Sequence, residues 1–235
     1  MDDTNTQMDN NLLIVQTEDG SNTIFNNLIG ENYHSKHGAL QESKHVFLES
    51  GLKYYLDQSS LNFSNISILE VGFGTGLNFM LTADYCTENR INLFYTGIEA
   101  YPLNAVMIGQ TGYNGFLTKE TWETFIQNYN SALRGSILLN EYCNLAIAPI
   151  KLIDFENDQQ FDIIYYDAFA STNQPEMWNE LAIAHTIKFL KPGGLFVTYA
   201  ITGNLKRMLK ALGCTIQKAP GAPGKREMLR AFKMI

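Results

Sequence analysis

The chain has 235 residues, of which 45% are hydrophobic and 17% charged, and its formal net charge is −7. This length suits one α/β domain with an added segment, and the apolar share is that of a globular rather than a disordered protein. No apolar run reaches the roughly 18 residues that span a bilayer, and the start shows neither a secretory nor a mitochondrial address. We therefore expect a cytoplasmic protein without a membrane partner.

Charge is unevenly distributed along the chain. Residues 203–235 contain eight basic residues against Glu227 alone, a net charge of +7, which leaves −14 for the other residues. Such a basic surface can bind phosphates even on an acidic protein, because charges beyond a Debye length of about 8 Å are screened. A solvated helix face is the alternative explanation.

Cysteine and histidine spacing indicates neither a disulfide framework nor a metal site. Three cysteines are far apart and include no Cys-x-x-Cys pair: Cys86, Cys143 and Cys214. This pattern favours reduced thiols that fill the core. The histidines near residue 40 lack metal-ligand spacing, so we expect no metal.

Residues 1–60 are predicted to form an N-terminal extension packed on a main domain of residues 61–235. Its acidic, Asn-rich start is expected to fray. Two short strands flank the hairpin signal Asp19-Gly20: residues 12–17 and 23–25. Apolar positions at helical spacing over residues 39–57 predict a helix that packs on the sheet as a lid.

From residue 66 onward, predicted strands and helices alternate as in a parallel α/β sheet. The strands cover residues 66–71, 93–98, 145–148, 161–167, 195–199, 214–218 and 228–234, and the helices cover 76–87, 102–110, 175–190 and 203–212. The last two strands should close the sheet in antiparallel pairing. Residues 191–194, Lys-Pro-Gly-Gly, predict a sharp break between helix and strand. The polar segment 111–140, with a helix near 119–129, is the expected insertion over the active site.

Residues 68–78 read I-L-E-V-G-F-G-T-G-L-N, an apolar strand that runs into Gly72, Gly74 and Gly76. Glycine tolerates positive φ and has no Cβ, so this turn can bend from strand to helix while a cofactor lies against bare backbone. We include Asn78, at its end, among the candidate cofactor contacts. A structural turn is the alternative.

The residues around the turn select among nucleotide cofactors. A dinucleotide fingerprint requires Gly or Ala where Leu77 stands, whereas Glu70 before the glycines and Glu99 after the second strand suit S-adenosylmethionine. Glu99 lies 27 positions past Gly72, near the offset of about 20 residues at which an acid reaches ribose hydroxyls. The alternatives are another nucleotide and, for Glu99, a surface acid.

Asp167 follows the buried run of residues 161–166, where an acid faces the cleft beyond a parallel sheet. Methyl transfer to an amine needs the neutral amine, and a carboxylate can orient that amine and take its proton. A helix cap or loop acid is the alternative. Phe169 and Trp178 could stack on a flipped base or fill the core.

The segment around residues 33–47 is unusually polar for a helix that packs on a core. We expect it to cover the amino-acid end of the cofactor. Glu42 could meet the ammonium group there, and Tyr33 or Ser35 the carboxylate.

Together these motifs resemble the methyltransferase domain of the bacterial tRNA 5-methylaminomethyl-2-thiouridine biosynthesis protein. The matching segments cover most of the chain: residues 33–47, 70–79, 98–99, 167–169, 175–178, 191–194 and 224–229. The resemblance implies a Rossmann-like class I fold with a mostly parallel, seven-stranded sheet. It also implies that S-adenosyl-L-methionine is used to convert 5-aminomethyl-(2-thio)uridine to 5-methylaminomethyl-(2-thio)uridine at the tRNA wobble position.

The resemblance also assigns residues. It places the catalytic acid on Asp167 and phosphate contacts on Lys225 and Arg226, which makes the tRNA anticodon stem-loop the expected partner. The chain looks like a stand-alone form without the FAD-dependent oxidoreductase domain, so a separate enzyme would supply the aminomethyl-uridine. Pro149 replaces the acid that binds adenine in related sequences, and adenine contact is expected at the backbone of Ile150 or at another residue.

Two other classes of function remain open on the sequence. A small-molecule amine methyltransferase or an aminopropyltransferase shares the fold and the glycine turn but needs no basic tail. A non-catalytic module would bind S-adenosylmethionine without performing chemistry.

Overall fold

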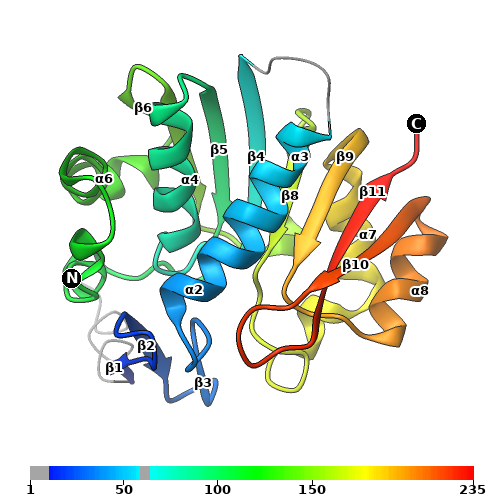
Figure 1. Ribbon diagram of the computed structural model, residues 1–235, viewed down its shortest axis with the longest axis horizontal. Helices are drawn as coiled ribbons and strands as arrows, with labels where there is room; N and C mark the ends of the chain where they lie inside the picture. The colour runs from blue at the N-terminus through cyan, green and yellow to red at the C-terminus, as the bar shows by residue number, and fades with distance from the viewer. Residues whose placement is uncertain (1–10, 59–63) are drawn as a thin grey trace.

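The computed structural model describes residues 11–58 and 64–235, and Figure 1 shows their arrangement. The predicted fraying of residues 1–10 and the predicted domain boundary after residue 60 lie outside the described residues. A small antiparallel sheet contains β1 (Leu12–Gln16), β2 (Asn22–Asn26) and β3 (Glu31–Asn32). The predicted hairpin around Asp19-Gly20 is thereby confirmed, and β3 is an additional short strand.

The large sheet has eight strands in the order β10-β11-β9-β8-β4-β5-β7-β6. They are β4 (Asn65–Val71), β5 (Asn92–Ile98), β6 (Ile137–Asn140), β7 (Cys143–Ala148), β8 (Phe161–Tyr166), β9 (Leu190–Thr198), β10 (Cys214–Pro220) and β11 (Glu227–Lys233). The five strands from β9 to β7 in this order are parallel, and β11, β10 and β6 pair antiparallel at the two edges. All seven predicted strands are found, and β6 adds an eighth.

Strand order reverses at β4, because the chain passes from β4 to β5 on one side and later returns to β8 on the other. Ligands of such sheets bind beyond the carboxyl end of the strands at this point. Alternation along β4 buries both faces: Ile68 packs with Tyr165 in one apolar cluster, and Leu69 with Tyr166 in the other.

Helices cover both faces of the large sheet (Figure 1). One face carries α2 (Ala39–Ser43), η1 (Lys44–Lys53), α3 (Tyr54–Asp57), α4 (Leu77–Glu88) and α6 (Lys119–Ala132), and the other carries α7 (Glu180–Lys188) and α8 (Gly203–Ala211). Short helices are α5 (Ala105–Gly109), η2 (Tyr113–Gly115), η3 (Leu152–Asp154) and η4 (Pro175–Trp178). The predicted lid helix is continuous from α2 to α3, and its middle ten residues form a π-helix.

Side-chain caps explain where the predicted helix boundaries were wrong. Asn104 accepts a hydrogen bond from Met107 N, so α5 begins after Pro102 and not at it. Asn179, in an extended conformation, accepts from Ala182 N and separates η4 from α7.

Two expectations about connecting segments were also wrong. Residues 191–194 are part of β9, which begins at Leu190, and a bulge in its pairing with β8 accommodates the extra residues. Residues 111–140 do not cover the active site, because α6 packs against α4, the edge strand β6 and its neighbour β7.

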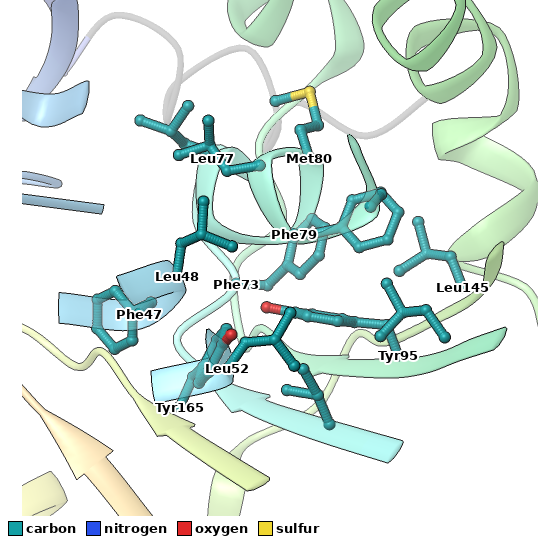
Figure 2. Packing of buried hydrophobic residues seen from close by; sticks show 14 of the residues in the cluster. Phe47, Leu48, Leu52, Phe73, Leu77, Phe79, Met80, Tyr95, Leu145 and Tyr165 are labelled. Atoms are coloured by element: carbon teal, nitrogen blue, oxygen red, sulfur yellow. The ribbon is translucent and has the colours of Figure 1, made fainter. Parts of the chain in front are cut away.

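Phe73, in the glycine turn, anchors one apolar cluster. Figure 2 shows Phe73 and Phe79 beside Tyr95 of β5, and Phe73 also packs against Phe125 of α6. A Cβ built on Gly97 of β5 would lie 2.3 Å from the Phe73 ring. The ring therefore requires glycine at this position of β5.

Replacing Gly97 by Ala should destabilise the protein by about 1–3 kcal/mol, because an extra methyl group overpacks a filled core. Urea unfolding of Gly97→Ala measures this loss. Gly109→Ala is the matched control, since a Cβ there meets nothing within 4 Å. Equal stability of the two variants would contradict the packing argument.

Candidate active site

A cavity of about 880 Å³ lies at the carboxyl ends of β4, β5 and β8. This volume is within the range of small-molecule and cofactor sites. Its walls include Gly72 and Gly74 after β4, Glu99 after β5, and Asp167 after β8. Of the described residues, none between 105 and 150 lines the cavity. The site is thus built at the predicted strand ends, together with residues between 12 and 42 and the loop between β10 and β11.

The glycine turn approaches its neighbours too closely for side chains. Gly72 has φ of +86°, and a Cβ on it would lie 2.4 Å from the carbonyl oxygen of Asp167. Gly74 has φ of +52°, and its Cβ would lie 2.9 Å from the Tyr33 ring. Both positions therefore require glycine and leave bare backbone at the cavity.

Glu99 braces this turn and also lines the cavity. Its Oε2 accepts a hydrogen bond from Gly74 N at 2.9 Å, and its Oε1 accepts from Tyr101 N at 3.0 Å. Burial raises the pKa of Glu99, although the two backbone hydrogen bonds oppose this shift. Each carboxylate oxygen keeps a lone pair that can accept a ligand hydroxyl.

A single amide connects two acids at the base of the site. Asn78 Nδ2 donates to Glu70 Oε1 and to Asp167 Oδ2, at 2.8 Å in each case. The hydroxyl of Tyr95 donates to the other oxygen of Glu70 at 2.8 Å. Glu70 is completely buried and does not line the cavity, so it supports Asn78 from beneath.

Both acids hold protons more strongly than usual. Burial raises the pKa of Glu70 well above its ordinary range, despite the hydrogen bond from Asn78. Burial, with repulsion from Glu42, raises the pKa of Asp167 to about 8. The carboxyl group of Asp167 is thus mainly protonated at neutral pH in the ligand-free protein.

The lid segment, residues 33–47, contributes Tyr33 and Glu42 to the cavity. Glu42 Oε1 forms an ion pair with Lys225 Nζ at 2.7 Å, and its Oε2 accepts from Ser35 N at 2.7 Å. The ammonium group of Lys225 lies 3.8 Å from the centroid of the Tyr199 ring. Glu42 therefore already has a cation partner from this chain.

The two predicted aromatic contacts have different positions. Phe169 lines the cavity and meets Tyr33 edge to face, with ring centroids 5.0 Å apart. Trp178 is buried against Tyr166 and Tyr199, and its indole donates to the carbonyl oxygen of Phe169 at 2.7 Å. Trp178 thus holds the Phe169 backbone from outside the cavity.

Five predicted site residues do not line the cavity: Glu70, Gly76, Ile150, Trp178 and Arg226. Gly76 faces the core, where a Cβ would lie 2.7 Å from the Phe125 ring. Ile150 turns outward because its N–H bonds to the carbonyl oxygen of Ala148, and the next three residues line the cavity in its place. Arg226 is exposed on the loop between β10 and β11.

Sequence reasoning missed two functional candidates. Tyr199 lines the cavity just after β9, and its hydroxyl donates to the carbonyl oxygen of Ala168 at 2.9 Å. The strand-end rule that selected Asp167 would also have selected Tyr199. Glu31 accepts from Ala170 N at 3.0 Å and from Asn173 Nδ2 at 2.8 Å. No local pattern marks Glu31, because its partners lie more than 100 positions away.

The remaining chemistry-bearing groups have structural positions. Cys86, Cys143 and Cys214 are free and buried, which confirms their prediction as core residues. Within residues 11–58 and 64–235, no cluster of three His, Cys, Asp or Glu residues could hold a metal ion. Over the same residues, every helix is too short or too polar to cross a bilayer.

Comparisons with known proteins agree on the class of protein. A family model described as S-adenosyl-L-methionine-dependent methyltransferase matches residues 117–234, half of the chain. This match includes Asp167, Phe169 and Lys225 but not the glycine turn.

Curated relatives match more of the chain. The tRNA 5-methylaminomethyl-2-thiouridine biosynthesis bifunctional protein MnmC of Leptospira borgpetersenii serovar Hardjo-bovis is 31% identical over 209 residues, covering 84% of this chain and 31% of that protein. The protein of the same name from Magnetococcus marinus is 30% identical over 210 residues, covering 84% of this chain and 30% of its own. The chain thus spans about a third of the length of these relatives.

A solved structure has a similar fold. The crystal structure of MNMC2 from Aquifex aeolicus superposes with a TM-score of 0.73 over 94% of this chain and 70% of that chain, at 22% sequence identity. This likeness shows the fold alone.

The raised pKa of Asp167 makes stability depend on pH. The pKa of Asp167 is about 8 in the folded protein, whereas the ordinary pKa of an aspartate side chain is 3.8. Because the folded state binds the proton more tightly, the free energy of unfolding should fall as pH rises from about 4 to about 8, by up to about 1.4 kcal/mol per pH unit.

The substitution Asp167→Asn keeps the acceptor for Asn78 and should remove this dependence, so that the variant gains stability over the wild type with rising pH. Urea unfolding at a series of pH values measures the difference. Asp158→Asn, which replaces an exposed acid outside the cavity, is the matched control. Parallel curves for the wild type and Asp167→Asn would refute the assignment.

Proposed function

The chain belongs to the S-adenosyl-L-methionine-dependent methyltransferases, and from this premise we propose that it methylates the aminomethyl group of a tRNA wobble uridine. The product would be 5-methylaminomethyl-(2-thio)uridine. The methyltransferase class and the cofactor predicted from the sequence are confirmed. The names of the curated relatives, which match 84% of this chain, support the tRNA substrate.

The residues at the cavity fit the cofactor. Gly72 and Gly74 present backbone where any side chain would collide, and Glu99 can accept hydroxyl hydrogens from a ribose. Tyr33 and Glu42 would face its amino-acid end, and Asn78 would lie between this end and Asp167. The bound cofactor supplies an electrophilic methyl group on a sulfonium ion.

Asp167 is the observation that carries the proposal. An alkylamine has a pKa near 10, so it arrives protonated and must lose a proton before its lone pair can react. Asp167 lies in the cavity, is fixed by Asn78, and has a pKa raised to about 8. Its carboxylate can therefore take the proton of a bound ammonium group near the operating pH, as an efficient general base requires.

The proposed substrate contacts lie at the cavity and on the loop between β10 and β11. We assign Phe169 and Tyr33, which line the cavity, to contact with a flipped base, and exposed Arg226 to a backbone phosphate of an anticodon stem-loop. A tRNA substrate implies action in the cytoplasm and a separate reaction that supplies the aminomethyl-uridine. The division into an N-terminal extension and a methyltransferase domain stays a prediction.

One experiment tests the substrate. The purified protein is incubated with labelled cofactor and bulk tRNA from a strain that lacks this gene, and the tRNA is digested to nucleosides. We expect the label in 5-methylaminomethyl-(2-thio)uridine. Label in another nucleoside or in a small amine would redirect the proposal, and cofactor binding without transfer would indicate a non-catalytic module.

Replacing Asp167 by Asn should lower the rate of methyl transfer to tRNA by about 10²–10⁴, the contribution of a positioned general base. Affinity for the cofactor, measured by calorimetry, should change little, because the glycine turn and Glu99 remain. Retention of the rate within about threefold would remove Asp167 from the catalytic role.

The pH dependence of kcat/KM should show the ionisation of Asp167. We expect a rising limb with its midpoint near pH 8 in the wild type, because the carboxylate is the reactive form. Initial rates over a series of pH values measure this limb. A flat profile across this range would contradict general-base catalysis by Asp167.

A further inference from the structure

Lys225 has a position that differs from its predicted contact with phosphate. It lines the cavity, its ammonium group is paired with Glu42 at 2.7 Å, and it lies 3.8 Å from the centre of the Tyr199 ring. Its neighbour Arg226 is exposed and does not line the cavity. Two consecutive basic residues thus have different surroundings.

The loop that carries Lys225 is fastened to the lid segment at further points. His45 Nε2 lies 2.8 Å from the carbonyl oxygen of Pro220, and Gly224 packs so closely on His37 that a Cβ would lie 2.4 Å from the ring. Figure 1 shows the loop between β10 and β11 at the same end of the large sheet's strands as the start of α2. The Lys225–Glu42 pair therefore belongs to a built contact between these two segments.

Tyr199 connects the Lys225–Glu42 pair to the backbone beside Asp167, the proposed general base. Tyr199, under the ammonium group, donates to the carbonyl oxygen of Ala168, the residue after Asp167. A cation held on this ring is favourable, and burial of Glu42 without a partner would be costly. Lys225 thus stabilises one wall of the cavity around Asp167.

The titratable groups that face Asp167 come from several elements. They are Glu70 of β4, Tyr95 of β5, Glu42 of α2, Glu31 of β3, Tyr199 after β9 and Lys225. Among these groups, Lys225 supplies the positive charge. The pKa of Asp167 is raised first by burial and then by repulsion from Glu42, whereas Lys225 lowers it. Removal of the Lys225 charge should therefore raise the pKa of Asp167 further.

We propose that Lys225 is a positioning residue of the proposed methyl-transfer site, which balances the charge of Glu42 so that the Asp167 carboxylate can form, and that it is not a phosphate contact. This inference rests on the proposed function. Arg226, on the outer side of the same loop, is left as the phosphate contact.

Lys225→Met, which keeps an unbranched stem and removes the charged ammonium group, tests this role beside Arg226→Met. In Lys225→Met the midpoint of the pH–rate profile should move up by about one pH unit, and the rate one unit below the wild-type midpoint should fall about tenfold. The salt dependence of tRNA binding should stay unchanged. In Arg226→Met the midpoint should stay, and the slope of log affinity against log salt should decrease by about 1.

Lys225→Arg keeps a cation and should return the midpoint toward the wild-type value. Lys225→Gln replaces Lys225→Met if the latter does not fold. A reduced salt slope with an unmoved midpoint in Lys225→Met would overturn the proposal and make Lys225 a phosphate contact.

A second measurement separates this inference from the proposed function, because it needs no tRNA. Asp167→Asn is compared with the wild type, and the double variant with Lys225→Met alone. The stability that Asp167→Asn adds should keep increasing to a higher pH in the second comparison than in the first. If the wild type does not methylate tRNA, the proposed function fails, and this unfolding experiment still decides the role of Lys225. An identical pH dependence with and without Lys225→Met would overturn the inference even if tRNA is methylated.

Discussion

The amide of Asn78 is the contact on which the site depends. It has two hydrogens, and it gives one to the buried Glu70 and one to Asp167 at the cavity. This arrangement requires that α4 begins directly after the glycine turn, so that its second residue reaches the ends of both β4 and β8. The close packing of Gly72 on the Asp167 backbone brings these strand ends together. The same turn thus shapes the fold and fixes the position of Asp167, whose pKa is raised by burial against the opposing effect of the hydrogen bond from Asn78.

Much of this architecture follows from local sequence. Alternating apolar strands, the three glycines and the residues just after each strand predicted the sheet, the turn and the acids Glu99 and Asp167. Helix boundaries were less predictable, because the side chains of Asn104 and Asn179 cap helices inside segments that were each predicted as one helix. The strand β9 includes residues 191–194, Lys-Pro-Gly-Gly, because it pairs with β8. No local sequence pattern predicts this pairing.

The walls of the cavity were the least predictable part. Lys225 was predicted as a site residue and lines the cavity, but its pairing with Glu42 joins residues that are 183 positions apart. Its position over Tyr199 depends on the fold of the hairpin of β10 and β11. The same holds for Glu31, which fixes the loop after Asp167 from the small N-terminal sheet. Such contacts come from tertiary packing and leave no periodic signal.

The separation of Glu42 from Lys225 has a consequence for synthesis on the ribosome. The lid segment emerges early, and its charged partner emerges only after another 183 residues have been added. Chains elongate at about 5–20 residues per second. For several seconds after β8 has been synthesised, a nascent chain therefore contains the glycine turn and the central strands β4, β5 and β8 but lacks Lys225 and the cavity wall that it closes. The hairpin of β10 and β11 supplies Lys225, so a chain that stops before this hairpin would lack the closed site even where its central strands have folded.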